Sequence, residues 1–207
     1  MMRVAILSES SADEAALRVL VDAVLGVSTA SVEVSLRSRG WPAVRSVLPA
    51  IIRALHYRSD TEGLVVVVDS NHTSLSAPET KSRMRELQAI STKIQSELSP
   101  VSGRVPLRIA IGVAAPAIEA WLLCKQFPEV SEANWEKGIA QRRDPYSKLE
   151  LKKRLYGVDY ASLELMTEKM VQAAHSLKTE LPLLKQQFPI GFGGMAQQLI
   201  EWRRVGA

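Results

Sequence analysis

The sequence feature that most constrains the fold is an uninterrupted apolar run, LVVVV at positions 64–68, which follows Gly63 and ends at Asp69. Four consecutive β-branched residues favour a strand, and a run without polar alternation is typical of a central parallel strand covered on both faces. Shorter apolar runs at Val4–Ser8 and Leu107–Val113 predict two more buried strands. We therefore expect a sheet that is largely parallel.

The segments between these strands carry apolar residues at helical spacing. Alternation of strands with helices predicts an α/β domain with helices on both faces of the sheet. The predicted helices cover Asp13–Leu25, Ala43–His56, Pro78–Leu98 and a segment from Ile118 onward, and Ser31–Leu36 alternates like a half-buried strand.

After about Phe127 the strand signal disappears and helical patterns dominate. We therefore divide the chain into an α/β domain at residues 1–127 and a helical extension at residues 128–207, packed on that domain without a Pro-, Gly- or Ser-rich linker. The extension is predicted to form helices over Tyr146–Leu155, Ser162–Leu177 and Met195–Arg203, and the glycine-rich segment 191–194 is interpreted as a turn before the last of them.

Composition excludes several classes of protein. The 207 residues are 46% hydrophobic and 23% charged, which is the balance of a globular protein. The chain shows neither the apolar core of a signal peptide nor a run near the ~18 apolar residues of a membrane span, so we expect no membrane partner. A single cysteine, Cys124, excludes a disulfide framework and fits a cytoplasmic location.

Acidic residues follow three of the predicted strands. Glu9 comes after the first strand, Asp69 ends the apolar run, and Glu119 lies one turn into the helix after Leu107–Val113. The carboxyl ends of parallel strands meet at one edge, where ligands of open α/β sheets bind. Because clustered carboxylates repel one another, their convergence indicates a divalent cation, and Mg²⁺ prefers such oxygen ligands. The alternative for each acid is a structural role in a turn or cap, and Asp13 is interpreted as a solvated charge on its helix.

The same residues resemble those of a known family. The segment ESSADEAAL at 9–17 resembles the opening motif of Toprim domains, and DSN at 69–71 resembles the Asp-x-Asp pair that ends a Toprim strand. The segment AIEAWLL at 117–123 is similar to one in small stand-alone Toprim-like proteins of prokaryotic defence and mobile-element loci, which are related to OLD-type nucleases. The resemblance covers roughly residues 3–125 and implies a Toprim-like, Rossmann-type sheet.

The resemblance also implies a phosphoryl-transfer site that depends on Mg²⁺ or Mn²⁺. By that resemblance Glu9 would be the general base or a metal ligand, Asp69 the principal metal ligand, and Glu119 a further catalytic carboxylate. Asn71 stands where the family has a second aspartate; its amide oxygen can bind a metal but adds no negative charge. Two interpretations follow: a nuclease acting on DNA or RNA, or a non-catalytic subunit that binds or regulates a protein partner. A third, an enzyme of small phosphate esters, would use the same metal chemistry.

Basic residues concentrate in the helical extension. Between Arg142 and Arg154 six basic residues stand against two acidic ones, and the difference of four equals the net charge of +4 of the whole chain. His72, near the acidic residues, is either a general acid or an exposed loop histidine. For the basic stretch we expect contacts with nucleic-acid phosphates, the alternative being a solvated helix face; the candidate residues are Lys148, Lys152, Lys153 and Arg154.

Overall fold

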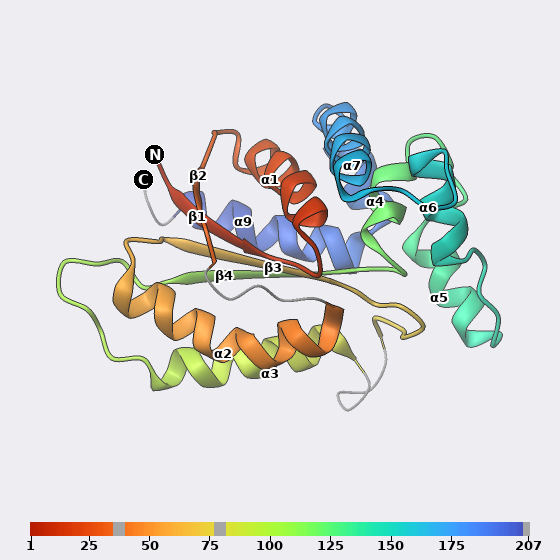
Figure 1. The fold of residues 1–207 in the computed structure, drawn as a ribbon. Coiled ribbons are helices and arrows are strands. Elements are labelled where there is room, and N and C mark those ends of the chain that lie inside the picture. Colours follow the sequence, from red (N-terminus) through yellow and green to blue (C-terminus); the bar gives the residue numbers. More distant parts are fainter. Residues whose placement is uncertain (35–39, 77–81, 205–207) are drawn as a thin grey trace.

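The chain forms a four-stranded, all-parallel sheet between two layers of helices (Figure 1). The computed structural model describes residues 1–34, 40–76 and 82–204. The strand order is β2-β1-β3-β4, which confirms the expected α/β class with a parallel sheet and helices on both faces. The strands are β1 (Arg3–Leu7), β2 (Ala30–Val32), β3 (Gly63–Asp69) and β4 (Arg108–Ala114).

The apolar run at 64–68 forms most of β3, and every residue of that strand is buried. Its neighbours are β1 and β4; Val65, for example, pairs with Ile6 on one side and Ala110 on the other. Helices cover both of its faces, so each side chain of the run reaches a core regardless of the face from which it projects. This explains the absence of polar alternation in the run.

The helices cover the sheet in an order set by the crossovers. One face is covered by α1 (Ser11–Leu25) and α9 (Gly194–Arg204), with α7 (Leu163–Leu177) packed on α1, and the other by α2 (Gly40–Arg58) and α3 (Arg83–Glu97) (Figure 1). Beyond the carboxyl ends of the strands lie α4 (Ile118–Leu123), α5 (Glu132–Ala140) and α6 (Lys148–Tyr156). The chain also contains α8 (Leu181–Gln187) and the π-helical turn η2 (Pro189–Gly193).

The last helix returns to the sheet and completes its core. Trp202 of α9 packs on Gly63, where a β-carbon would lie only 2.4 Å from the indole ring. Gln198 of α9 accepts a hydrogen bond from the Ile111 N–H (3.1 Å) and donates one to the Ile111 carbonyl oxygen (3.4 Å). Through these contacts the extension covers the outer side of β4, which lies at an edge of the sheet.

Several predicted boundaries differ from the observed ones. The helix expected from Pro78 begins at Arg83, because Ser82 is extended and its hydroxyl caps the helix by accepting from the Arg85 N–H; residues 77–81 lie outside the described residues. The strand expected over Ser31–Leu36 is observed as β2 and ends at Val32. Residues 35 and 36 of the expected segment lie outside the described residues.

The glycine-rich segment 191–194 belongs to η2 and the start of α9, so the prediction of a simple turn was wrong. The buried Glu132 carboxylate accepts hydrogen bonds from the Ile190 and Gly191 N–H groups, both at 2.9 Å, and so holds the π-helical turn. No helix in the described ranges combines the length and the apolar character needed to cross a membrane.

Candidate functional site

Glu9, Asp69 and Glu119 come together at the edge of the sheet toward which the strands point. Glu9 lies just beyond β1, Asp69 ends β3, and Glu119 is the second residue of α4. Glu9 Oε1 accepts a hydrogen bond from the Asp69 N–H at 3.1 Å, and Asp69 Oδ1 accepts one from the Ile118 N–H at 3.1 Å. Asp69 therefore connects the end of the first strand with the beginning of α4.

Asp13 is a fourth carboxylate of this cluster. The residue lies in the first turn of α1, and burial, followed by the charges of Asp69, Glu119 and Glu9, raises its pKa from 3.8 to about 8. Its Oδ2 lies 3.5 Å from the Ser8 hydroxyl, which points it toward the sheet. The interpretation of Asp13 as a solvated helix charge was therefore wrong.

Glu119 is the most deeply buried acid of the cluster, with 3% of its surface exposed. Its Oε1 accepts a hydrogen bond from the Tyr156 hydroxyl at 2.8 Å, and Oε2 has no hydrogen-bond partner among the described residues. Burial, and next the charge of Asp69, raises the pKa of this carboxyl. A buried oxygen without a donor is costly, because the desolvation of the carboxylate is only partly compensated.

Three basic side chains approach the four carboxylates. The Lys148 ammonium forms an ion pair with Asp69 Oδ2, Lys152 Nζ lies 3.9 Å from Glu119 Oε1, and Arg83 Nη1 lies 3.7 Å from Glu9 Oε1.

Burial disfavours the charge of Lys148, but the nearby carboxylates outweigh burial and raise its pKa. Burial and Asp69 raise the pKa of Glu9 despite its basic neighbours.

The four acids at this edge of the sheet, Glu9, Asp13, Asp69 and Glu119, are called the acid cluster below.

The acid cluster offers the oxygen donors that a hard divalent cation prefers. The unpartnered Oε2 of Glu119 and the raised pKa of Asp13 both indicate that the described residues do not compensate the ionisation of all four acids. As the side chains stand, no three acidic, histidine or cysteine side chains in the described part of the chain are arranged around one ion. The donor set thus fits a cation chemically, and binding would require the Lys148 ammonium to leave Asp69.

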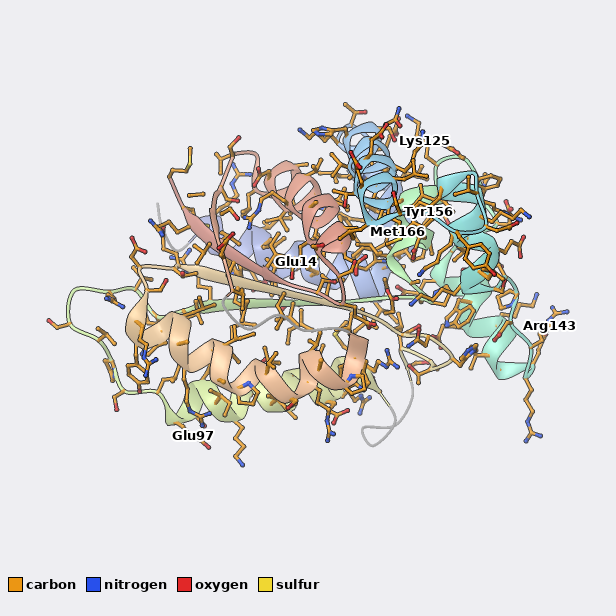
Figure 2. The ribbon with its side chains drawn as sticks, viewed as in Figure 1. Glu14, Glu97, Lys125, Arg143, Tyr156 and Met166 are labelled. Carbon is orange, nitrogen blue, oxygen red and sulfur yellow. The ribbon has the colours of Figure 1, made fainter. Side chains whose placement is uncertain are left out.

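The four basic residues expected to contact nucleic acid do not form one surface. Lys148 and Lys152 reach into the acid cluster, whereas Lys153 pairs with Asp159 at 2.9 Å and Arg154 pairs with Glu129 at 2.9 Å. Arg143, from the same basic stretch, lies at the far end of α5 and away from the sheet (Figure 2). The exposed His72 lies 3.2 Å from Asp144.

The sequence did not place Asp13, Arg83 and Tyr156 beside the other acids, although a signal existed for Asp13 and Tyr156. Asp13 precedes Ala16, Leu17 and Leu20 at helical spacing and so lies on the buried stripe of α1. Lys148, Lys152 and Tyr156 are spaced by four residues and share one face of α6, which is the face that meets the cluster. Tyr156 lies where α6 approaches α4 (Figure 2).

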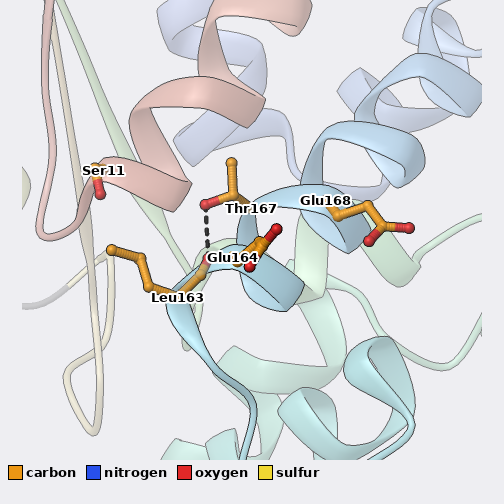
Figure 3. A pocket seen from close by; sticks show the side chains of 5 residues that line it. All are labelled: Ser11, Leu163, Glu164, Thr167 and Glu168. Atoms are coloured by element: carbon orange, nitrogen blue, oxygen red, sulfur yellow. Dashed lines mark hydrogen bonds between the residues drawn. The ribbon is translucent and has the colours of Figure 1, made fainter.

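A groove of about 690 Å³ lies between the first turn of α1 and the amino-terminal half of α7 (Figure 3). Its wall on α1 is Ser11, two residues before Asp13. The other wall combines an exposed leucine with polar and acidic side chains from α7, namely Leu163, Glu164, Thr167 and Glu168.

Comparison of the chain with models of protein families, with curated proteins and with solved structures found no match. The geometry and charge of the acid cluster are therefore the features of this chain that bear on its function.

Proposed function

We propose that the protein is a Mg²⁺- or Mn²⁺-dependent phosphoryl-transfer enzyme, and that it is a nuclease acting on DNA or RNA. The observation that supports this most is the charge of the acid cluster. Four carboxylates meet at the carboxyl edge of a parallel sheet, and among the described residues three basic side chains, those of Arg83, Lys148 and Lys152, approach them. The order of the three sequence motifs, which resembles that of Toprim domains, adds to the proposal.

In this proposal Asp69, Glu9 and Glu119 hold the cation, and Asp13 lies close enough to add a further charge. A bound Mg²⁺ supplies Lewis acidity at a phosphoryl oxygen and lowers the pKa of water. Glu9 is the candidate proton acceptor, because its raised pKa makes it a stronger base than an ordinary glutamate and its second oxygen, Oε2, is not used in the bond to Asp69.

In this proposal the basic residues around the acid cluster bind the phosphate groups of the substrate. Lys148, Lys152 and Arg83 lie where the oxygens of a phosphodiester would approach a cation held by the carboxylates. Lys153 and Arg154, at the outer side of α6, would contact neighbouring phosphates after release from their exposed acidic partners.

Calorimetric titration of the metal-free protein with Mn²⁺ tests the site directly. We expect saturable binding, and we expect Asp69→Asn to weaken it by at least about tenfold because it removes the central charge. Asp60→Asn is the matched control, since Asp60 is 66% exposed and paired with Arg3 near the opposite ends of the strands. Equal Mn²⁺ affinity in the wild type and Asp69→Asn would contradict the proposed site.

The activity itself is tested with end-labelled single-stranded DNA, duplex DNA and RNA in the presence of Mg²⁺ or Mn²⁺. Cleavage of at least one substrate that disappears in Asp69→Asn and persists in Asp60→Asn is the expected result. A protein that binds Mn²⁺ but cleaves none of the three would not be a nuclease.

A second candidate, a non-catalytic subunit with a weakened metal site, is favoured by the Lys148 ammonium on Asp69 and by the neutral amide of Asn71. On this reading the lysine permanently replaces a cation. Wild-type protein would then not bind Mn²⁺, and Lys148→Met, which removes the ammonium but retains a long side chain, would create binding. The nuclease proposal expects binding in the wild type.

A further inference from the structure

Arg83, the first residue of α3, directs its guanidinium into the candidate site. Nη1 donates a hydrogen bond to the Asp69 carbonyl oxygen and lies 3.7 Å from Glu9 Oε1. The guanidinium carbon lies 5.0 Å from the centre of the Trp41 ring, so the indole of α2 stacks on the cation. The side chain is 15% exposed, so part of it remains accessible to solvent.

Asn71 holds the same guanidinium from another side. Its backbone is left-handed, with φ of 51°, a conformation that asparagine adopts more readily than most residues, and its N–H donates to the Pro116 carbonyl oxygen at 2.9 Å. With its amide oxygen turned toward Arg83, Asn71 accepts hydrogen bonds from Nη1 at 3.0 Å and from Nη2 at 2.9 Å. In the opposite orientation of the amide, the Asn71 oxygen has one contact, with Lys148 Nζ at 3.4 Å. We therefore assign the orientation in which the oxygen faces Arg83.

These contacts leave part of the guanidinium free. A guanidinium has five N–H groups, and the Asp69 carbonyl and the Asn71 amide use the two on Nη1 and one of the two on Nη2. The N–H of Nε and the second N–H of Nη2 have no hydrogen-bond partner among the described residues. These two groups point the same way and form the planar fork that binds carboxylate and phosphate oxygens in pairs.

We propose that Arg83 binds a phosphoryl oxygen pair of the ligand through this fork, and that Asn71 is the positioning residue that aims it. The inference rests on the proposed function, in which phosphate approaches the acid cluster. It also gives a reason for an amide at position 71. An aspartate there would place a second carboxylate beside the guanidinium, in addition to Glu9, whereas a neutral amide holds the guanidinium without further neutralising its charge.

The test is titration with inorganic phosphate, with and without Mg²⁺, followed by calorimetry and by tryptophan fluorescence. Trp121, Trp135 and Trp202 are buried, and Trp41 is half-buried against Arg83, so binding should change the Trp41 emission. Trp41→Phe should lose the fluorescence change, which identifies Trp41 as its source. Arg83→Lys, which retains the charge without the fork, should weaken phosphate binding by about tenfold or more.

Two substitutions of Asn71 separate positioning from a structural role. Asn71→Gly keeps the left-handed turn and removes the amide, and Asn71→Asp keeps both the turn and the hydrogen bonds but adds a charge. We expect both to weaken phosphate binding and Asn71→Asp to weaken it more. If Asn71 only stabilised the turn, Asn71→Gly, which keeps the turn, would bind phosphate like the wild type. Urea midpoints of each variant show whether the fold is retained.

The outcomes separate this inference from the proposed function. Phosphate binding that needs Arg83, in a protein that cleaves no nucleic acid, would support the inference and contradict the nuclease. Nucleic-acid cleavage with unchanged phosphate binding in Arg83→Lys, or absence of phosphate binding in the wild type, would overturn the inference.

Discussion

Asp13→Asn should stabilise the metal-free protein at neutral and alkaline pH. Burial and then the carboxylates of Asp69, Glu119 and Glu9 raise the pKa of Asp13 from 3.8 to about 8. The folded protein therefore holds this proton more tightly than the unfolded chain does. Its contribution to stability is fully present below pH 3.8, falls as the pH rises, and is lost once the pH exceeds about 8.

The size of the effect follows from the same interval. At pH 7 the folded protein keeps the Asp13 proton, whereas the unfolded chain has released it since the pH passed 3.8. Each of the roughly three pH units between 3.8 and 7 costs the folded state about 1.36 kcal/mol, so the total cost at pH 7 is about 4 kcal/mol. Above pH 8 the same reasoning gives about 6 kcal/mol. Asparagine has the shape of a protonated aspartate and no charge to lose, so the variant avoids this cost.

Urea unfolding followed by tryptophan fluorescence in EDTA, at pH 4, 7 and 9, measures the difference. The gain of Asp13→Asn over the wild type should be near zero at pH 4 and should grow at pH 7 and again at pH 9. Asp60→Asn is the control, because its exposed side chain should give a small change that does not grow with pH. A gain that is equal at the three pH values, or absent at pH 9, would refute the reasoning.

Two further predictions concern packing and the buried acid, and both are measured as changes in the free energy of unfolding. Gly63→Ala should destabilise the fold by about 1–3 kcal/mol, since the new methyl group meets the Trp202 ring; Gly194→Ala, a helical position with open space around it, should be neutral or stabilising. Equal effects of the two would contradict the packing of α9 on β3. Tyr156→Phe should cost about 1–3 kcal/mol, because the buried Glu119 Oε1 loses its hydroxyl donor; an unchanged midpoint would show that water or Lys152 replaces the hydroxyl.

The sequence pattern predicted the sheet well because burial on both faces leaves a direct record in composition. The run at 64–68 is apolar throughout since neither face of β3 meets water. The same reasoning located Glu9, Asp69 and Glu119 at strand ends, which parallel topology brings to one edge. In the α/β domain the arrangement of buried parallel strands therefore explains both the apolar runs in the sequence and the position of the acids that follow them.

The remaining parts of the site depend on contacts between segments far apart in the sequence. Lys148 follows Asp69 by 79 positions, and only the packing of α6 beyond the strand ends shows that the two side chains pair. The prediction that the basic stretch contacts phosphates was based on its charge and on the i, i+4 spacing of Lys148 and Lys152, and neither observation reveals the acidic partners of these lysines. The short helices α5 and α8, of nine and seven residues, were not predicted.

Among the side chains that the structure describes, the charges of the acid cluster and its basic neighbours balance only while Asp13 keeps its proton. Glu9, Asp69 and Glu119 then match Arg83, Lys148 and Lys152 in number, and the loss of the Asp13 proton adds one uncompensated negative charge. A divalent cation would compensate that charge and replace the ammonium on Asp69 in one event. Under the proposed function, cation binding, release of the Asp13 proton and movement of Lys148 would therefore be linked, and each would become easier once the other two had occurred. The displaced ammonium would remain beside the cluster, in a position to meet a phosphate bound as proposed by Arg83.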